Sequence, residues 1–501
     1  MKTKKAFLNF ITDIIPLVII SILGIFKLKY FIKFLGDDTL GLYQLFSNIM
    51  VYIALVDGGL ASAVIYSLYK PNVEGDKEKI NELLSGAFRA FSLIGAIVFF
   101  IAALISFILP FFIKDNSFSY WYTSLSFILF SLSNVFGYFF VPYQAILDVK
   151  EKKYIFNLIS QIGQIVLSIL EIVMLFIGLG FVPILIMHAV IKLVFNIVLV
   201  IVTKRIYPEV NMQNKKKDYS FNRQLKDLIF HKINGLVGSN IDILIITRMV
   251  GLPAVAIYST YNYIINQLKN ILGKISGSLT AIIGNQMVRS KEKVYDLYLE
   301  FNSLLFFIAT VICVPLTLAI DGFIDIWYEG EIKTSFMIAI SFVAILFMFI
   351  VKMSTTTFVT SGGLYKETKY CALTDTIVNL TLSLTLAYFI GIPGVLIATA
   401  ISVFIAEYIL KTLVVHKHIF NKSPLKFFVK NIKFYVFYII DLIVGYIIID
   451  KIIISNILIW FVVFFIFTII NTFVIFIVYS IFKELIFLGR FKELVGKRKK
   501  K

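Results

Sequence analysis

Long apolar runs separated by short polar segments fill the chain from end to end. A membrane-spanning helix needs about 20 consecutive, mostly apolar residues. The hydropathy pattern predicts fourteen such helices, at residues 7–34, 39–67, 80–112, 118–147, 154–177, 180–203, 225–248, 252–286, 295–320, 334–360, 369–390, 393–415, 431–450 and 452–482. The runs are too long for strands and lack the alternation of a β-barrel, so helices must satisfy the backbone in lipid. The pattern therefore predicts an all-α integral membrane protein.

The composition supports this prediction and excludes other classes of protein. Of the 501 residues, 59% are hydrophobic and 16% are charged, whereas about 25% of an average soluble domain is charged. No polar block is long enough to form a separate soluble catalytic domain. The two cysteines, Cys313 and Cys371, lie in or beside apolar spans, so we expect buried free thiols rather than a disulfide framework.

The net charge of +18 comes mainly from lysine and arginine in the loops. If the loops alternate between the two sides of a membrane, 34 of these residues lie on one side and four (Lys114, Arg248, Lys333 and Lys451) on the other. Positively charged loops face the cytoplasm. We therefore predict a multi-pass protein of the cytoplasmic (inner) membrane with both termini cytoplasmic. The basic tail, Lys497–Lys501, is expected to be attracted to anionic membrane lipids, and binding to nucleic acid is not expected.

Short segments recur at nearly constant offsets along the chain, which indicates an internal duplication. The matches are Gly36 and Tyr43 with Gly251 and Tyr258 at an offset of 215, Lys150–Tyr154 with Lys366–Tyr370 at 216, and Ile177-Gly178 with Ile390-Gly391 at 213. Each copy contains six predicted helices, so both copies enter the membrane in the same direction. We predict an N-lobe (1–206), a cytoplasmic linker (207–224), a C-lobe (225–416), and a terminal hairpin with a basic tail (417–501). Parallel repeats of this kind are typical of alternating-access transporters.

A polar stripe in the eighth predicted helix indicates a substrate cavity. Polar residues at bilayer depth are costly and usually face a bundle interior or an aqueous space. The stripe repeats every four residues, so its members share one helix face; they are Tyr258, Asn262, Asn266, Asn270 and Lys274, with Lys269 beside them. Lys27 and Lys29 in the first helix are further candidates for a cationic substrate site. The alternatives are polar packing between helices for the stripe and snorkelling to the outer interface for Lys29.

The repeat also pairs opposite charges in the two copies, which suggests gates. At an offset of 215, Lys27 corresponds to Asp242, both in the outer part of the membrane; Asp57 lies near the counterpart of Lys274 in the inner part. We predict that a Lys27–Asp242 contact closes the outer gate and an Asp57–Lys274 contact the inner gate. The alternative for Asp57, which precedes two glycines, is that it satisfies local backbone donors.

The remaining charges and the histidines predict structural roles. Lys352, Asp375 and Glu407 lie at similar depth, so we expect an ion-paired cluster in the C-lobe. Arg89, Glu171 and Lys192 are expected to form a similar cluster in the N-lobe, although their depths agree less well. An acid among these six residues is a candidate for coupling to a cation. The four histidines, His188, His231, His416 and His418, have no metal-site spacing, and His416 and His418 are expected to be solvated. We predict no catalytic residue, metal site or cofactor.

Two segments resemble a known family of membrane proteins. Phe34–Tyr43, with the following Leu55–Ala63, is similar to the opening of the Wzx-type polysaccharide repeat-unit flippases (O-antigen, teichoic acid and exopolysaccharide). Gly235–Tyr258, with its Asp242 and its Arg248–Gly251 run, is similar to the start of that family's second lobe. These flippases belong to the multidrug/oligosaccharidyl-lipid/polysaccharide (MOP) exporter superfamily, so the resemblance implies a MOP/MATE-like fold over nearly the whole chain.

The resemblance implies transport of an undecaprenyl-diphosphate-linked oligosaccharide repeat unit from the inner to the outer leaflet by alternating access. The expected partners are this polyprenyl-diphosphate-linked glycan, membrane lipids and a coupling ion, H⁺ or Na⁺, with the protein working as a monomer. Two alternatives stay open, a MATE-like multidrug or cation antiporter and a lipid II flippase. A drug antiporter would favour an acidic cavity, whereas the candidates here are mostly lysines. Short outer loops disfavour a lipid-linked sugar polymerase or ligase, so we expect no enzyme.

Overall fold

A computed structural model describes residues 2–212, 216–221, 241–289, 294–449 and 456–487. These residues are almost entirely helical and contain no strand, which confirms the predicted all-α class. Ten of the helices described are long and apolar enough to cross a membrane, and a bent pair, Val18–Asp57 with Leu60–Glu74, supplies up to one more. The seventh predicted span lies largely outside the described residues. The eighth is the long helix α10 (Leu252–Arg289), which is too polar to belong to these ten.

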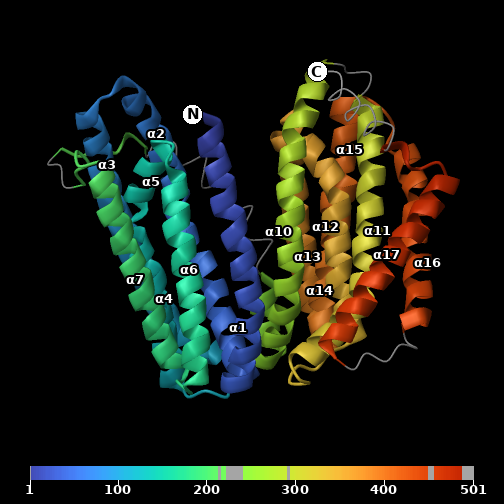
Figure 1. The fold of residues 1–501 in the computed structure, drawn as a ribbon, viewed down its shortest axis with the longest axis horizontal. Coiled ribbons are helices and arrows are strands. Elements are labelled where there is room, and N and C mark those ends of the chain that lie inside the picture. Colours follow the sequence, from blue (N-terminus) through green and yellow to red (C-terminus); the bar gives the residue numbers. More distant parts are fainter. Residues whose placement is uncertain (1, 213–215, 222–240, 290–293, 450–455, 488–501) are drawn as a thin grey trace. The chain divides into compact units, whose positions relative to one another are not determined.

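The chain divides into two compact units, Met1–Ala256 and Ile257–Lys501 (Figure 1). The first unit holds the helices α1 (Lys2–Ile53), η1 (Ala54–Asp57), α2 (Leu60–Glu74), α3 (Lys77–Phe112), α4 (Tyr120–Tyr138), α5 (Val141–Val149), α6 (Lys153–Phe176), α7 (Phe181–Ile206) and α9 (Ile241–Met249). Within this unit α1 packs along α6, and α4 packs between α3 and α7. The predicted linker at 207–224 falls inside the first unit because α9 packs on α1. The lobe boundaries drawn from the duplication stay a prediction.

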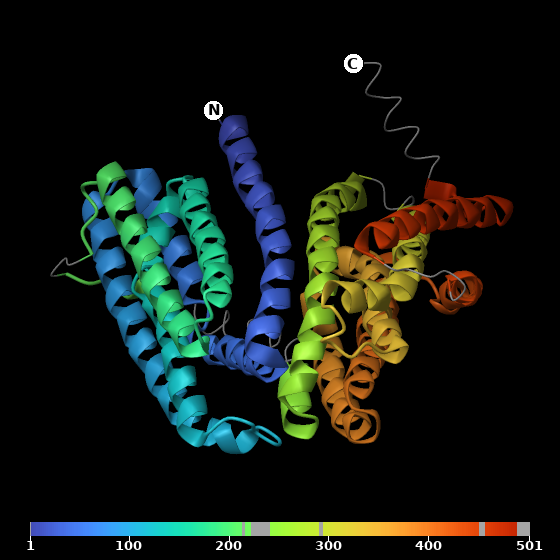
Figure 2. The ribbon, with the colours of Figure 1, turned by 60° about the horizontal axis from the view of Figure 1, so that its bottom comes forward.

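The second unit begins within α10 and contains the two most buried of the apolar helices that the structure describes. Its further helices are α11 (Val294–Trp327), α12 (Phe336–Gly362), α13 (Tyr365–Ile390), α14 (Ile392–Ser402), the π-helix η4 (Val403–Leu410), α15 (Lys411–Val415), the π-helix η5 (His416–Phe420), α16 (Leu425–Ile449) and α17 (Ile457–Ile481). In α11 and α12, 67% of the most apolar window is buried inside the protein, against 17% in α16 and 11% in α17. Figure 2 shows α16 and α17, in red, at the edge of this unit. The terminal hairpin, like α13 with 17%, therefore buries little of its apolar surface within the second unit.

Glycines in the left-handed region mark the matched junctions of the two copies. Gly36 has a φ of 83° at the kink inside α1, and its counterpart Gly251 has a φ of 123° before α10. Gly178 and Gly391, which precede α7 and α14, have φ values of 80° and 62°. A side chain strains this conformation, so glycine is the residue that fits. The shared geometry agrees with the duplication inferred from the sequence.

The loops of the first unit gather at two ends that differ in charge. At the basic end the Lys150 and Lys152 ammonium groups lie 5.8 and 5.0 Å from the Tyr207 ring, and the Asn81 amide donates to the Glu209 carbonyl at 2.9 Å. At the other end Ser117 donates to Asp38 at 2.9 Å. The loops near 75, 150 and 207 therefore share one side, as the alternating topology predicts.

This arrangement gives a direct test of the predicted topology. Single cysteines at Ser117, Glu329 and Lys216, in a protein without Cys313 and Cys371, should report the two sides of the membrane. A membrane-impermeant maleimide added to intact cells should label positions 117 and 329, and should label position 216 only after the membrane is broken. Labelling of position 216 in intact cells would contradict the cytoplasmic assignment of the basic loops.

Candidate functional site

A buried ion pair joins three helices of the first unit. Lys27 of α1 lies 2.8 Å from the Oε1 atom of Glu171 on α6, and the ring nitrogen Nε2 of His188 on α7 hydrogen-bonds to the same oxygen. The Glu171 side chain is fully buried and that of Lys27 is 16% exposed. Lys27 also donates to the Tyr43 hydroxyl at 3.4 Å. Lys27, predicted as a substrate cation, is therefore neutralised by a partner that the sequence analysis did not assign to it.

The kink at Gly36 explains why Lys27 and Tyr43 meet. The chain folds back there, so two side chains 16 residues apart lie on facing parts of α1. Aromatic rings surround the Lys27–Glu171 ion pair. Phe31 packs edge-on against Phe181, and Tyr43 packs edge-on against His188. Exclusion of water strengthens the attraction between the ammonium and the carboxylate, while removal of either partner becomes costly. Among the described residues, the Oε2 atom of Glu171 has no hydrogen-bond partner.

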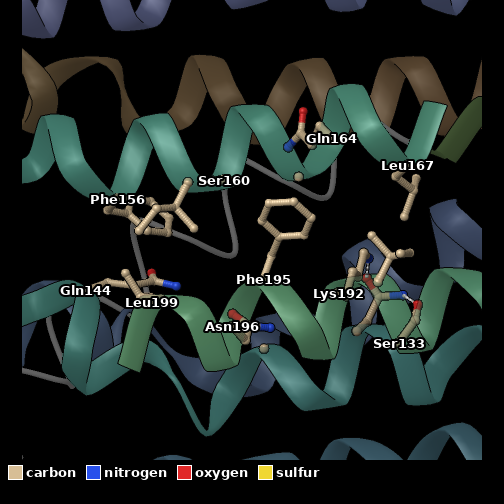
Figure 3. Close-up of a pocket in the computed structure, with 15 residues that line it drawn as sticks. Ser133, Gln144, Phe156, Ser160, Gln164, Leu167, Lys192, Phe195, Asn196 and Leu199 are labelled. Carbon is tan, nitrogen blue, oxygen red and sulfur yellow. Dashed lines mark hydrogen bonds between the residues drawn. The ribbon is translucent and has the colours of Figure 1, made fainter. Parts of the chain in front are cut away.

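Beside this ion pair, two cavities of the first unit meet at Lys192. One, of about 540 Å³, extends from Tyr43 and His188 to Asp57. The other, of about 300 Å³, lies between α4, α6 and α7 (Figure 3). Both are lined by Asn134, Gly137, Gln144, Leu167 and Lys192. Volumes in this range are typical of ligand sites, and a few convergent polar groups are what such sites use for specificity.

The smaller cavity is lined by amides, hydroxyls, two phenylalanine rings and one cation. Its polar residues are Ser133, Asn134, Gln144, Ser160, Gln164, Lys192 and Asn196. The Lys192 ammonium donates to the Asn134 side-chain oxygen at 3.2 Å. In the part of the chain that the structure describes, no carboxylate lies within ion-pair distance of Lys192. The cavity can therefore offer hydrogen bonds and a positive charge to a ligand.

A helical spacing in the sequence could have revealed this cavity. His188, Lys192 and Asn196 recur every four residues on α7, and Ser160 and Gln164 are four apart on α6. Residues with this spacing share a helix face. The stripe on α7 has the same form as the predicted stripe on α10, but the sequence analysis grouped Lys192 by depth with Glu171 and Arg89.

Apart from Tyr258, which is buried, the predicted stripe on α10 lies on an accessible or half-buried face of its helix. Asn266, Asn270 and Lys274 are exposed and Asn262 is half-buried. Between them the helix turns Tyr261 and Ile265 inward, where Tyr261 stacks on Phe342 of α12. The ammonium of Lys269 lies 5.9 Å from the Phe349 ring, while Lys29 is half-buried on α1. The role of these residues in binding substrate stays a prediction.

The gate residues have local environments that bear on their predicted roles. Asp57 accepts a hydrogen bond from the backbone of Gly59 at 2.9 Å, which is the alternative role proposed for it. Asp242 is 7% exposed on α9. Lys27 is engaged by Glu171, so a Lys27–Asp242 contact requires exchange of partner. Both gates stay predictions.

The predicted ion-paired cluster of the second copy is confirmed for two of its members. Lys352 lies 3.5 Å from Glu407, and Lys411, which the sequence analysis had not included, lies 2.6 Å from the same carboxylate. Glu407 belongs to the π-helix η4, whose wide turn is frequent at functional sites. Asp375 lies beside this cluster, and among the described residues its buried Oδ1 atom has no hydrogen-bond partner. A second site of dense charge thus lies inside the second unit.

Two expectations about polar residues are wrong. His416 is fully buried rather than solvated, because the helix continues as η5 and aromatic rings, including Tyr298 and Phe427, pack around it. Arg89 is exposed on α3, so it is not part of a charge cluster with Glu171 and Lys192. Periodicity and depth did not show the direction of these side chains.

Comparison with solved structures connects this architecture to known transporters. The structure of the lipid II flippase MurJ in an inward closed conformation is similar with a TM-score of 0.69 and 17% identity, over 95% of this chain and 99% of that chain. An inward-facing MATE multidrug-resistance transporter of the MOP superfamily gives a TM-score of 0.61 and 15% identity, over 81% and 97% of the two chains. The chain has the fold of MurJ and the MATE transporters. An outward-facing MATE structure agrees, with a TM-score of 0.52, 15% identity and coverage of 82% and 96%.

The comparisons support the predicted superfamily fold without distinguishing its branches. No protein-family model and no curated protein sequence matches the chain. The structural neighbours include both a flippase and multidrug transporters. Sequence identities of 15–17% show a shared fold but do not identify the substrate. The substrate must therefore be inferred from the polar cavities and from the charged residues that line them.

Proposed function

We propose that this protein is a flippase that moves an undecaprenyl-diphosphate-linked oligosaccharide from the inner to the outer leaflet of the cytoplasmic membrane by alternating access. The observation that supports this most is a lysine in a cavity of hydroxyls and carboxamides between membrane-spanning helices. Sugars carry many hydroxyl groups, and amide side chains both donate and accept hydrogen bonds. Lys192 adds attraction for an anionic ligand. A transporter of this kind needs no catalytic residue, so the proposal includes no enzymatic step.

The membrane potential favours this direction of transport. Negative charge moving outward across a membrane that is negative inside gains about 2.3 kcal/mol per charge per 100 mV. A coupling ion, H⁺ or Na⁺, is a further proposed partner. Glu171, a buried carboxylate on the network around Lys27, is the acid we propose for this role in the N-lobe. The proposed working unit is a monomer.

A lipid II flippase is the second candidate, since the similarity to MurJ spans 95% of the chain whereas the similarity to the inward-facing MATE structure spans 81%. A MATE-like antiporter of cationic drugs is less favoured because a cationic ligand would be repelled by Lys192. Both candidates differ from the leading one in the lipid or drug that they would move.

Gene deletion separates the three functions. In the parent organism, loss of the gene should make a lipid-linked oligosaccharide accumulate at the cytoplasmic face, as measured by mass spectrometry of extracted lipids, and a plasmid copy should reverse this. Accumulation of lipid II would support the second candidate instead. Unchanged lipids together with increased sensitivity to cationic drugs would overturn the flippase proposal.

A further inference from the structure

The small cavity of the first unit and the charge cluster of the second occupy matching positions of the internal repeat. At the offset of 215, five cavity residues have counterparts in or beside the cluster. Gly137, Ser160, Gln164, Lys192 and Asn196 correspond to Lys352, Asp375, Asn379, Glu407 and Lys411. The offset is 215 at Gly36 and Tyr43, 216 at Lys150 before α6, and 213 at Ile177 before α7. The cavity and the cluster therefore lie on corresponding helices of the two copies, and the residue pairs correspond to within two positions.

In the second copy, three of the charges satisfy one another. The Glu407 carboxylate lies between the ammonium groups of Lys352 and Lys411, at 3.5 and 2.6 Å. Asn379 donates a hydrogen bond to Thr399 at 3.0 Å. This carboxylate is therefore held by lysines of the protein itself and is not open to a ligand.

In the first copy, the corresponding positions carry no acidic residue that could form such an ion pair inside the cavity. Ser160 stands where the second copy has Asp375, and Lys192 stands where it has Glu407. Gly137 replaces Lys352, and a side chain added at Gly137 would meet no atom within 4 Å. What remains is a space of about 300 Å³, an ammonium that bonds to Asn134, and no carboxylate of the described residues within ion-pair distance.

The lining of this space suits a sugar. Figure 3 shows Phe195 between α6 and α7, with Ser160, Lys192 and Asn196 around it. The ring lies against Gly163, where an added methyl group would approach it to 2.9 Å. An aromatic ring can pack against the C–H face of a pyranose while amides and hydroxyls bind its hydroxyl groups. Together with Lys192, these groups match a sugar that carries one negative charge.

We infer that the cavity between α4, α6 and α7 binds a carboxylated sugar, a hexuronate, of the transported glycan. The ligand's carboxylate pairs with Lys192, much as the Glu407 carboxylate pairs with Lys352 and Lys411 in the second copy. A diphosphate carries more charge than one ammonium can neutralise, and Lys27, the nearest predicted cation, is held by Glu171. This inference rests on the proposed function for the origin of the sugar, but the site itself is defined by its own side chains.

Binding of free sugars to the purified full-length protein in detergent tests this assignment. D-glucuronate, D-glucose and inorganic pyrophosphate serve as probes in ligand-observed NMR. Glucuronate should bind in preference to glucose and pyrophosphate. Lys192→Gln should weaken glucuronate binding by about tenfold or more, as expected for the loss of a charge-assisted hydrogen bond, and Lys192→Arg should keep part of it. Lys70→Gln, at a side chain that is 83% exposed, is the matched control and should change nothing.

A second pair of variants keeps the lysine and supplies the missing acid. Ser160→Asp adds a negative charge to the lining of the cavity, at the end away from Lys192, and should reduce glucuronate binding by repelling its carboxylate. Ser160→Asn, which has the same size without the charge, should retain it. Equal binding of glucose, preference for pyrophosphate, or no effect of Lys192→Gln and Ser160→Asp would overturn the inference.

The deletion experiment keeps this inference separable from the proposed function. If lipid-linked oligosaccharide accumulates in the deletion strain but glucuronate binding does not depend on Lys192, the carboxylated-sugar site is wrong and the flippase stands. If glucuronate binding depends on Lys192 but no lipid-linked glycan accumulates, the site stands and the flippase is wrong.

Discussion

Replacement of Glu171 by leucine should lower the free energy of unfolding by about 3–5 kcal/mol, because it leaves a buried ammonium without its counter-charge. Lys27 is 2.8 Å from this carboxylate and is enclosed by aromatic rings. His188 loses the same acceptor. Lys27→Met should destabilise the protein comparably, since it leaves a fully buried carboxylate with only a histidine. The measurement is reversible unfolding of the purified protein in mixed micelles.

The double variant Lys27→Met, Glu171→Leu shows whether charge is the cause. Neighbouring residues in one network are not additive, and removing both charges leaves neither of them unsatisfied. The double variant should therefore be more stable than the sum of the two single effects predicts. Strict additivity would show that lost packing, not an uncompensated charge, accounts for the single variants.

The pair Lys79–Asp218 is a matched surface control, with a separation of 2.9 Å against 2.8 Å for Lys27–Glu171. Its side chains are 43% and 19% exposed, so water screens the charges. Exposed ion pairs contribute about 0–1 kcal/mol. Lys79→Met should thus have a much smaller effect than Lys27→Met. Equal losses at the two pairs would contradict the assignment of the Lys27 network as a desolvated one.

Much of the fold could be predicted because lipid imposes strict rules on the backbone. A span must be long, apolar and helical, so residues 80–112 and 180–203 correspond closely to α3 and α7. The junctions at Gly36 and Gly251 were visible because a left-handed turn favours glycine. The positions of the helices and of the glycine turns depend on local sequence, so they can be predicted from the hydropathy pattern and the glycine positions.

The site was harder to predict because its residues come from separate helices. Hydropathy and depth do not say which neighbour a side chain faces, so the pairing of Lys27 with Glu171, 144 positions away in the sequence, was missed. Such contacts depend on how the helices pack, and the Lys27–Glu171 contact forms because α1 packs along α6. His416 was misjudged for a related reason, since the charged neighbours Lys417 and His418 suggest a loop although η5 continues the helix there.

The cation pair on α10 gives the other large expected effect, on transport rather than on stability. Lys274 is exposed, on the same face as the exposed amides of Asn266 and Asn270. An ammonium binds phosphate as a point charge. If Lys269 and Lys274 hold the diphosphate of the lipid carrier, the double variant Lys269→Ala, Lys274→Ala should reduce glycan export by about tenfold or more, the effect of losing hydrogen bonds to a charged group.

The comparison variants make this result specific to the polar stripe of α10. Lys366→Ala with Lys369→Ala removes two exposed lysines from the predicted cytoplasmic loop of the same unit and should leave export unchanged. Arginine at 269 and 274 should restore more export than glutamine, because arginine keeps the charge and binds phosphate through two N–H groups. Protein levels in the membrane should be equal in all variants, since none of these side chains is fully buried. Full export by the double alanine variant would assign the α10 stripe to helix packing, and the anionic lipid would have to be held elsewhere.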